Sequence, residues 1–210
     1  EIVSYLKEHK ITAIDKLIIT HYDSDHIGGA AALLDYAEVG GVLVPAYSKG
    51  SSTYRRFTAA MEAAGIQPTA LTETLTFELD KAQYTVYPPE RTSYPNNEDN
   101  EYSLIVGVTH GENRFLFAGD ALTERLGEFT ALGEGTYDFL KVSNHGDYFE
   151  GVEAFFRAVS PKYAAITCSD KNPADARTVS ALEAVGAQVF LTRDGSVKVT
   201  SDGRTISVLQ

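Results

Sequence analysis

Six consecutive residues, 21–26, contain four side chains that can bind a metal ion. They are His21, Asp23, Asp25 and His26. They directly follow an apolar run at 16–20 that predicts a short buried strand, and in layered α/β folds ligands bind at the carboxyl ends of strands. Imidazole and carboxylate ligands suit zinc, manganese or iron, and the absence of thiolates weakens a purely structural zinc site. A solvated turn with chance histidines is the weaker interpretation, because two of the five histidines fall in this turn.

Two more candidate ligands follow later apolar segments. Asp120 comes after the segment 114–117, and His145 comes after the segment 139–142. Taken alone, Asp120 could be the N-cap of a helix predicted at 122–132, and His145 could lie in a surface turn.

The segment 21–26 resembles the His-x-His-x-Asp-His signature of metallo-β-lactamase-fold hydrolases. Its aspartate at the second position is typical of the hydrolase domain of the bacterial competence protein ComEC and related stand-alone proteins. Four further segments resemble motifs of this family in the same order, and they are 103–106, 115–120, 140–146 and 160–164. The resemblance covers nearly the whole chain.

This resemblance implies a divalent-metal cofactor of one or two ions, zinc or manganese. The implied metal ligands are His21 and Asp23 for one ion, Asp25, His26 and His145 for another, and Asp120 as the bridge between them. Asp25 and Asp120 would be the catalytic carboxylates. A water made acidic by the metal would be the nucleophile, and Asp25 would orient it or accept its proton.

The chain departs from the family's pattern at several positions. Asp23 replaces an imidazole, which shifts the preference toward manganese or magnesium without excluding zinc. Asn144 stands where the family has a histidine, and it can donate hydrogen bonds but is a weak ligand. Where many members carry a third ligand for the first ion, this chain has Asp99 and Asn100, which are therefore possible extra ligands.

A late histidine of ComEC-like chains is also missing, from the segment 169–174. Lys171 and Asn172 in that segment could contact a phosphate, as could Asn144. The alternative for Lys171 and Asn172 is an ordinary turn before a helix.

The pattern of apolar residues places these candidates in a mixed α/β fold. Helices are predicted at 2–6, 27–37, 53–64, 122–132, 152–159 and 174–185, and strands at 16–20, 42–44, 74–79, 82–87, 102–109, 114–117, 139–142, 163–167, 188–191, 197–199 and 205–209, with a polar loop at 88–101. The prediction is a single domain, 1–210, in α/β class (α+β in some schemes): a four-layer αββα sandwich of the metallo-β-lactamase type. Family members usually begin with strands that carry an Asp-Val-Gly-Gln-Gly-Asp motif, so these leading strands are expected to be absent here.

Composition limits the classes of function. The formal charge of −11 argues against avid non-specific binding of polyanions, although a phosphate ester can still bind where cations dominate the local charge. The single cysteine, Cys168, excludes an internal disulfide framework. No apolar run of about 18 residues is present.

Together these features predict a metal-dependent hydrolase that acts on a phosphodiester, with nucleic acid such as DNA implied by the resemblance. The alternative is a degenerate, non-catalytic domain with a structural or binding role. Resemblance to ComEC implies a bacterial, extracytoplasmic or membrane-associated context, and a cytoplasmic one applies otherwise.

Overall fold

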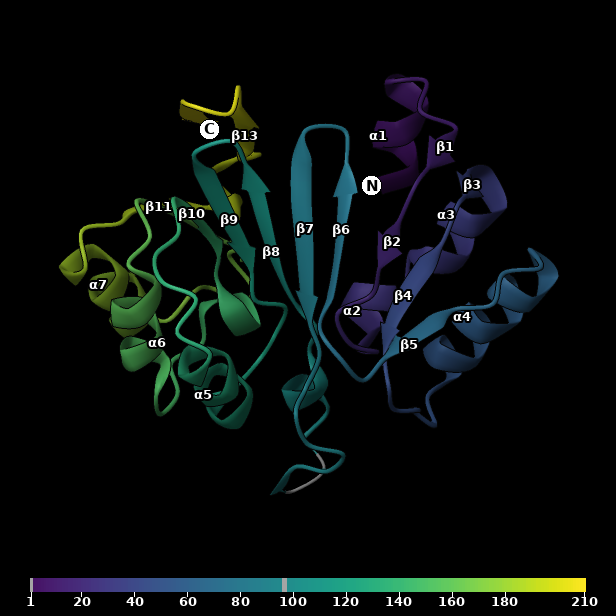
Figure 1. Ribbon diagram of the computed structural model, residues 1–210, viewed down its shortest axis with the longest axis horizontal. Helices are drawn as coiled ribbons and strands as arrows, with labels where there is room; N and C mark the ends of the chain where they lie inside the picture. The colour runs from purple at the N-terminus through teal and green to yellow at the C-terminus, as the bar shows by residue number, and fades with distance from the viewer. Residues whose placement is uncertain (1, 96–97) are drawn as a thin grey trace. The chain divides into compact units, whose positions relative to one another are not determined.

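A computed structural model of the chain describes residues 2–95 and 98–210 (Figure 1). The chain divides into two compact units, Glu1–Thr72 and Glu73–Gln210. The interpretation of residues 1–210 as a single domain stays a prediction. Asn96 and Asn97, in the predicted loop, lie outside the described residues.

The first unit is built on short parallel strands. Strands β2 (Leu17–Ile18), β4 (Val42–Pro45) and β5 (Thr69–Leu71) form one sheet in that order, and β1 (Ala13–Ile14) pairs with β3 (Glu38–Val39). The helices are α1 (Ile2–Glu8), α2 (Ser24–Ile27), α3 (Ala30–Tyr36) and α4 (Ser52–Ala63). Phe57 and Met61, one turn apart on α4, are buried in the core of this unit with Tyr22 and Ile27.

The helix predicted at 27–37 is present as α3, but it begins later than expected, and a separate short helix precedes it. Helix α2 already begins at Ser24, so Asp25 and His26 are helical residues, and Gly28 and Gly29 separate α2 from α3. A Cβ atom on Gly28 would lie 2.3 Å from the Ser24 carbonyl oxygen. Only glycine permits this close approach, which brings the second helix directly after the metal-ligand candidates.

The second unit contains a seven-stranded mixed sheet, in the order β12-β11-β10-β9-β8-β7-β6. Its strands are β6 (Leu75–Leu79), β7 (Ala82–Tyr87), β8 (Ile105–His110), β9 (Asn113–Phe117), β10 (Phe139–Lys141), β11 (Tyr163–Ile166) and β12 (Gln188–Leu191). Neighbours from β6 to β9 are antiparallel, and neighbours from β9 to β12 are parallel. The antiparallel half is the predicted meander. Helices connect the parallel half, as parallel strands require.

Three helices cover one face of this sheet (Figure 1), and they are α5 (Thr123–Ala131), α6 (Val152–Val159) and α7 (Ala176–Ala184). They bury Phe129, Phe155 and Leu182 in one cluster with Leu140 and Ile166 of the strands. Burial of side chains of this size contributes about 1.5–3 kcal/mol each, so this cluster fixes the parallel strands and whatever follows them. Short 3₁₀ helices η2 (Asp99–Tyr102), η3 (Ser143–Gly146) and η4 (Thr192–Asp194) and a hairpin of β13 (Lys198–Ser201) and β14 (Ile206–Leu209) complete the unit.

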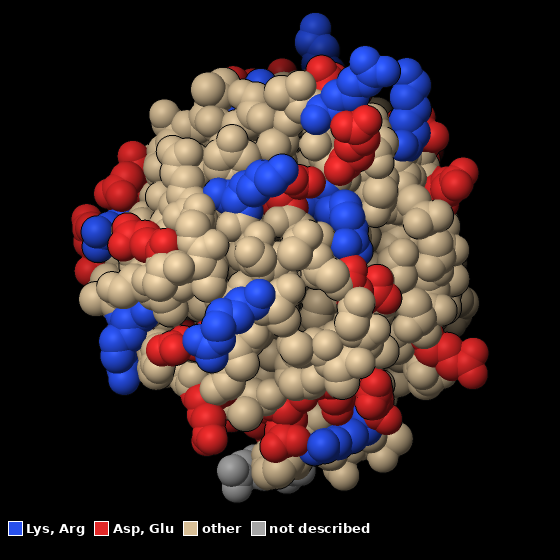
Figure 2. Space-filling model, turned by 60° about the vertical axis from the view of Figure 1, so that its left-hand side comes forward, with Lys and Arg blue, Asp and Glu red and all other residues tan. Residues whose placement is uncertain are grey.

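The fold class expected from the sequence, α/β with a large sheet flanked by helices, is confirmed. Within residues 2–95 and 98–210, no helix combines the length and apolarity needed to cross a bilayer. Basic and acidic side chains are interspersed on the face drawn in Figure 2.

Candidate metal centre

In the second unit, three neighbouring parallel strands bring candidate residues to one edge of the sheet. Strand β10 pairs with β9 on one side and with β11 on the other, so that Lys141 lies opposite both Phe117 and Ala165. The residues that follow these strands, Asp120, His145 and Thr167, therefore meet at the carboxyl ends of the strands, where layered α/β folds bind ligands.

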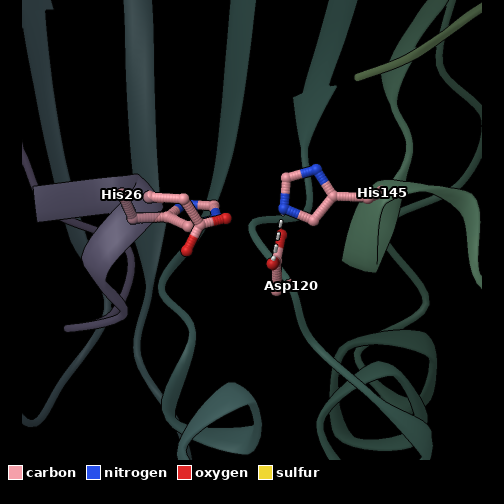
Figure 3. A group of neighbouring side chains, drawn as sticks. His26, Asp120 and His145 are labelled. Carbon is pink, nitrogen blue, oxygen red and sulfur yellow. Dashed lines mark ion pairs between the residues drawn. The ribbon is translucent and has the colours of Figure 1, made fainter. Parts of the chain in front are cut away.

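Asp120 and His145 face one another at this edge. His145 Nε2 lies 3.2 Å from Asp120 Oδ2, as the dashed line in Figure 3 marks. The other ring nitrogen, Nδ1, lies 2.9 Å from the Thr167 carbonyl oxygen and 3.0 Å from its hydroxyl. Since a carbonyl oxygen only accepts, Nδ1 carries a hydrogen and Nε2 is the atom left to bind a metal. Such a second contact fixes the ring orientation of a metal-binding histidine.

The hydrogen bond to Asp120 raises the pKa of His145 to about 9, and burial opposes this effect only in part. His145 is thus protonated at neutral pH when no metal is bound. A divalent ion must displace that proton, so its binding at this position is coupled to pH.

The backbone around His145 has an uncommon conformation. Asn144 (φ 44°), His145 (φ 52°) and Gly146 (φ 80°) are three consecutive residues in the left-handed region. For a residue other than glycine this costs about 1–3 kcal/mol and persists only where the surroundings hold it, most often at functional sites. A Cβ atom on Gly146 would lie 2.7 Å from a methyl group of Ile166. Both the positive φ and this close contact therefore require glycine at position 146.

Asp120 does not cap the following helix, so that alternative was wrong. Helix α5 begins at Thr123, and its first backbone N–H groups donate instead to the buried carboxylate of Glu101. The Asp120 side chain is almost fully buried, and its Oδ1 lies 3.3 Å from Lys141 Nζ. The carboxylate therefore faces an ammonium group and an imidazole.

A buried polar network holds the backbone of Asp120 in place. Its N–H donates to the hydroxyl of Ser103 at 3.2 Å. Arg125, 1% exposed, donates from Nε to the Ser103 carbonyl oxygen at 3.0 Å and from Nη2 to the Tyr87 carbonyl oxygen at 2.7 Å. Ser103, which the sequence motif singled out, thus positions Asp120 and does not act as a ligand.

The remaining candidates of the second unit are less tightly placed. Asn100 Nδ2 donates to Asn144 Oδ1 at 3.4 Å, which brings one possible extra ligand beside a possible substrate contact, and Asp99 precedes it in η2. Lys171 and Asn172 are exposed in a turn closed by hydrogen bonds between Ser169 and Asn172. The turn alternative describes their backbone correctly.

In the first unit too, candidate ligands follow a strand that has a parallel neighbour. Strands β2 and β4 are parallel neighbours, and the segment 21–26 follows β2. His21 is fully buried, its Nδ1 lies 3.1 Å from the hydroxyl of Thr20, and its ring centre lies 4.1 Å from that of His26. On the same helical turn, Oδ2 of Asp25 lies 3.6 Å from Nε2 of His26. Three of the four predicted ligands of this segment are thus brought together.

Tyr22 fixes this segment to the core. Its N–H donates to the hydroxyl of Tyr47 at 2.9 Å, and its own hydroxyl donates to the Pro45 carbonyl oxygen at 3.1 Å. The ring also packs against Tyr47 and Tyr54. Burial raises the pKa of Tyr22, so this tyrosine is an anchor and not a proton donor.

Asp23 has a partner that the sequence did not predict. Its Oδ1 accepts a hydrogen bond from Lys49 Nζ, and about a third of the Asp23 side chain and a quarter of the Lys49 side chain are exposed. Lys49 follows β4, as the segment 21–26 follows β2, so the rule that polar residues after parallel strands meet could have identified it.

The donors of each unit fit a divalent ion. Both sets consist of imidazole nitrogens and carboxylate oxygens without thiolates, which suits zinc, manganese and iron. In the second unit the metal-facing nitrogen of His145 already points at a carboxylate and is oriented from behind by Thr167.

Comparison with known proteins agrees with this chemistry. Residues 4–169 match the Metallo-beta-lactamase superfamily. The chain belongs to this superfamily. The resemblance inferred from the motifs is thereby confirmed.

Two curated proteins are similar in sequence over most of the chain. ComE operon protein 3 of Bacillus subtilis (strain 168) is 28% identical over 177 residues, which cover 81% of this chain and 22% of that protein. Recombination protein 2 of Haemophilus influenzae is 27% identical over 173 residues, which cover 82% of this chain and 20% of that protein. The chain thus spans about a fifth of the length of these curated relatives. The first match agrees with the expected ComEC-like relationship.

Solved structures share the fold. The metallo-beta-lactamase fold protein YhfI from Bacillus subtilis superposes with a TM-score of 0.57 at 12% identity, covering 93% of this chain and 80% of that one. Igni18, a metallo hydrolase from Ignicoccus hospitalis, gives 0.53 at 14% identity, with coverages of 93% and 79%. At such low identity these similarities concern the fold alone.

Proposed function

We propose that this protein is a metal-dependent hydrolase that cleaves phosphodiesters, with DNA as the favoured substrate. The observation that carries the proposal is the facing pair of Asp120 and His145 at the carboxyl ends of parallel strands, with His145 held on a left-handed backbone segment. Membership of the metallo-beta-lactamase superfamily supports hydrolysis. One relative is named a recombination protein, and since recombination acts on DNA, that name favours a phosphodiester substrate.

The proposed ligands of the first unit are His21, Asp23, Asp25 and His26, and those of the second unit are Asp120 and His145. Asp99 and Asn100 are further candidates, and the cofactor is one or two ions of zinc or manganese. A divalent ion supplies two things when bound: it lowers the pKa of a bound water to about 7, and it polarises a phosphoryl oxygen.

The side chains divide the remaining tasks. Asp25 orients the attacking water and accepts its proton, because it is an exposed carboxylate next to His26. Asp120 faces the Lys141 ammonium and the His145 imidazole, which orient its carboxylate. Asn144, Lys171 and Asn172 donate hydrogen bonds to the phosphate. On a chain of net charge −11, a polyanionic substrate depends on such local contacts.

The test is the release of nitrophenol from bis(4-nitrophenyl) phosphate with added manganese or zinc. We expect Asp120→Ala to lower the rate about a hundred-fold or more, because the variant loses the carboxylate between Lys141 and His145. Glu183→Ala, on the exposed side of α7, is the matched control and keeps the wild-type rate. Equal background rates in the wild type and Asp120→Ala would refute the proposal. Cleavage of single-stranded DNA by the active protein then tests the substrate class.

The second candidate function is a non-catalytic, metal-binding domain. The ion pair between Asp23 and Lys49 favours this candidate, because the lysine neutralises the charge of a proposed metal ligand. For such a domain, a chelator would lower the melting temperature while no phosphodiester was hydrolysed under any metal condition.

A further inference from the structure

The pairing of Asp23 with Lys49 sets a limit on the metal content of the first unit. The Lys49 ammonium contacts Oδ1 of Asp23, and both side chains are more than half buried. In such surroundings a unit charge interacts more strongly with its neighbours than it would in water. The ammonium therefore already supplies one positive charge at the carboxylate proposed for the first ion.

The backbone on both sides of this pair is held in place. Tyr22, next to Asp23, donates its N–H to the hydroxyl of Tyr47, and Tyr47 donates its own N–H to the Pro45 carbonyl oxygen. Beyond Lys49, Arg55 donates to the Gly50 carbonyl oxygen at 2.6 Å. Ser51 then caps α4 by accepting a hydrogen bond from the Tyr54 N–H at 3.1 Å. Lys49 thus extends from a fixed turn toward a fixed loop.

We propose that the Lys49 ammonium is a built-in cation that takes the place of a divalent ion at Asp23, so that the wild-type protein binds one divalent ion and not two. This inference rests on the proposed function, in which the chain binds one or two divalent ions, and it narrows that number to one by removing Asp23 from the ligands of the bound ion. The ammonium occupies an acceptor site on Oδ1 and would repel a divalent ion that approached either oxygen of this half-buried carboxylate.

The inference also explains the aspartate at the second position of the signature. A neutral imidazole at position 23 would not attract an ammonium, whereas a carboxylate does. Asp23 and Lys49 are therefore complementary, and the change of ligand type goes together with the cation that faces it.

The test counts bound ions. Protein is dialysed to equilibrium against manganese, and in parallel against zinc, and metal per chain is measured by elemental analysis. We expect one ion in the wild type and two in Lys49→Met, which removes the charge but keeps the aliphatic stem. Lys49→Gln is a second neutral variant with the same expectation, and melting temperatures verify that each variant is folded.

Three controls identify the cause of any change. Lys49→Arg keeps the charge and stays at one ion. Arg56→Met removes a cation that donates to the carbonyl oxygen of Gly28, and it also stays at one ion. Asp23→Asn keeps the single ion, because Asp23 does not hold it.

The outcomes separate this inference from the proposed function. Two ions in the wild type, an unchanged or lower count in both neutral variants, or loss of the ion in Asp23→Asn would each overturn the inference while leaving a metal-binding protein. Uptake of no ion by any variant would overturn the proposed function together with the inference.

Discussion

At the scale of residues, the proposed chemistry depends on how His145 is presented. Its ring reaches Asp120 only because Asn144, His145 and Gly146 share a left-handed backbone conformation, and Thr167 fixes the ring from behind. The imidazoles and carboxylates could be predicted, since these residue types are few and directly follow apolar strands. Lys49 could have been identified from its position after a parallel strand, although its contact with Asp23 is visible only in the structure. Thr167 could not, because threonine is an ordinary surface residue and only its tertiary contact with His145 gives it a role.

Replacing Gly146 tests this presentation. Gly146→Ala places a methyl group against Ile166 at a positive φ, so we expect a loss of about 2–4 kcal/mol in the free energy of unfolding, measured with urea. The control is Gly186→Ala, because Gly186 also has a positive φ (90°) but nothing lies within 4 Å of its Cβ position. Its expected loss is about 1–2 kcal/mol, the cost of the backbone conformation alone. Equal losses would mean that packing against Ile166 does not constrain the segment.

At the scale of elements, the carboxyl ends of parallel strands gather the candidates within each unit. Periodicity predicted the meander and the strands β9 to β12, because apolar runs of four or more residues have a readable pattern. The strands β1, β3 and β5, of two or three residues, have no such pattern and escaped prediction. The role of Glu101 escaped too: it caps α5 from 21 positions or more away, and no local signal marks such a contact.

The start of β10 gives a prediction about pH. Asp138, next to this start, accepts a hydrogen bond from the Arg114 N–H at 2.8 Å and forms an ion pair with Lys162 at 2.7 Å. Burial alone would raise the pKa of Asp138, but these contacts hold it below the ordinary 3.8. A lowered folded-state pKa contributes stability above the unfolded pKa, and this contribution is lost as the pH falls through the folded value.

Wild type should therefore exceed Asp138→Asn in free energy of unfolding by about 1 kcal/mol at neutral pH, a modest value because Lys162 is largely exposed. The difference should shrink as the pH is lowered below 3.8. Urea titrations at several pH values measure it. A difference that stays constant over that range would contradict the assignment of the ion pair.

At the scale of the whole molecule, the chain is a member of the metallo-beta-lactamase superfamily in two compact units, each with its own core. The fold class could be predicted because several motifs occur in the family's order, which constrains the chain more than any single motif does. The substrate could not be predicted in this way. The net charge of −11 indicates only which molecules the protein repels at long range, and the mixed surface in Figure 2 does not single out one class of ligand.

The most direct test of the central claim is the affinity for manganese or zinc of the wild type and of His145→Ala, measured by calorimetric titration. His145 Nε2 is the ligand atom whose orientation the structure fixes most firmly. The account predicts that the wild type binds a divalent ion, that His145→Ala binds it at least about ten-fold more weakly, and that both keep the same fold. Equal affinity in the two proteins, or no binding by the wild type, would contradict it.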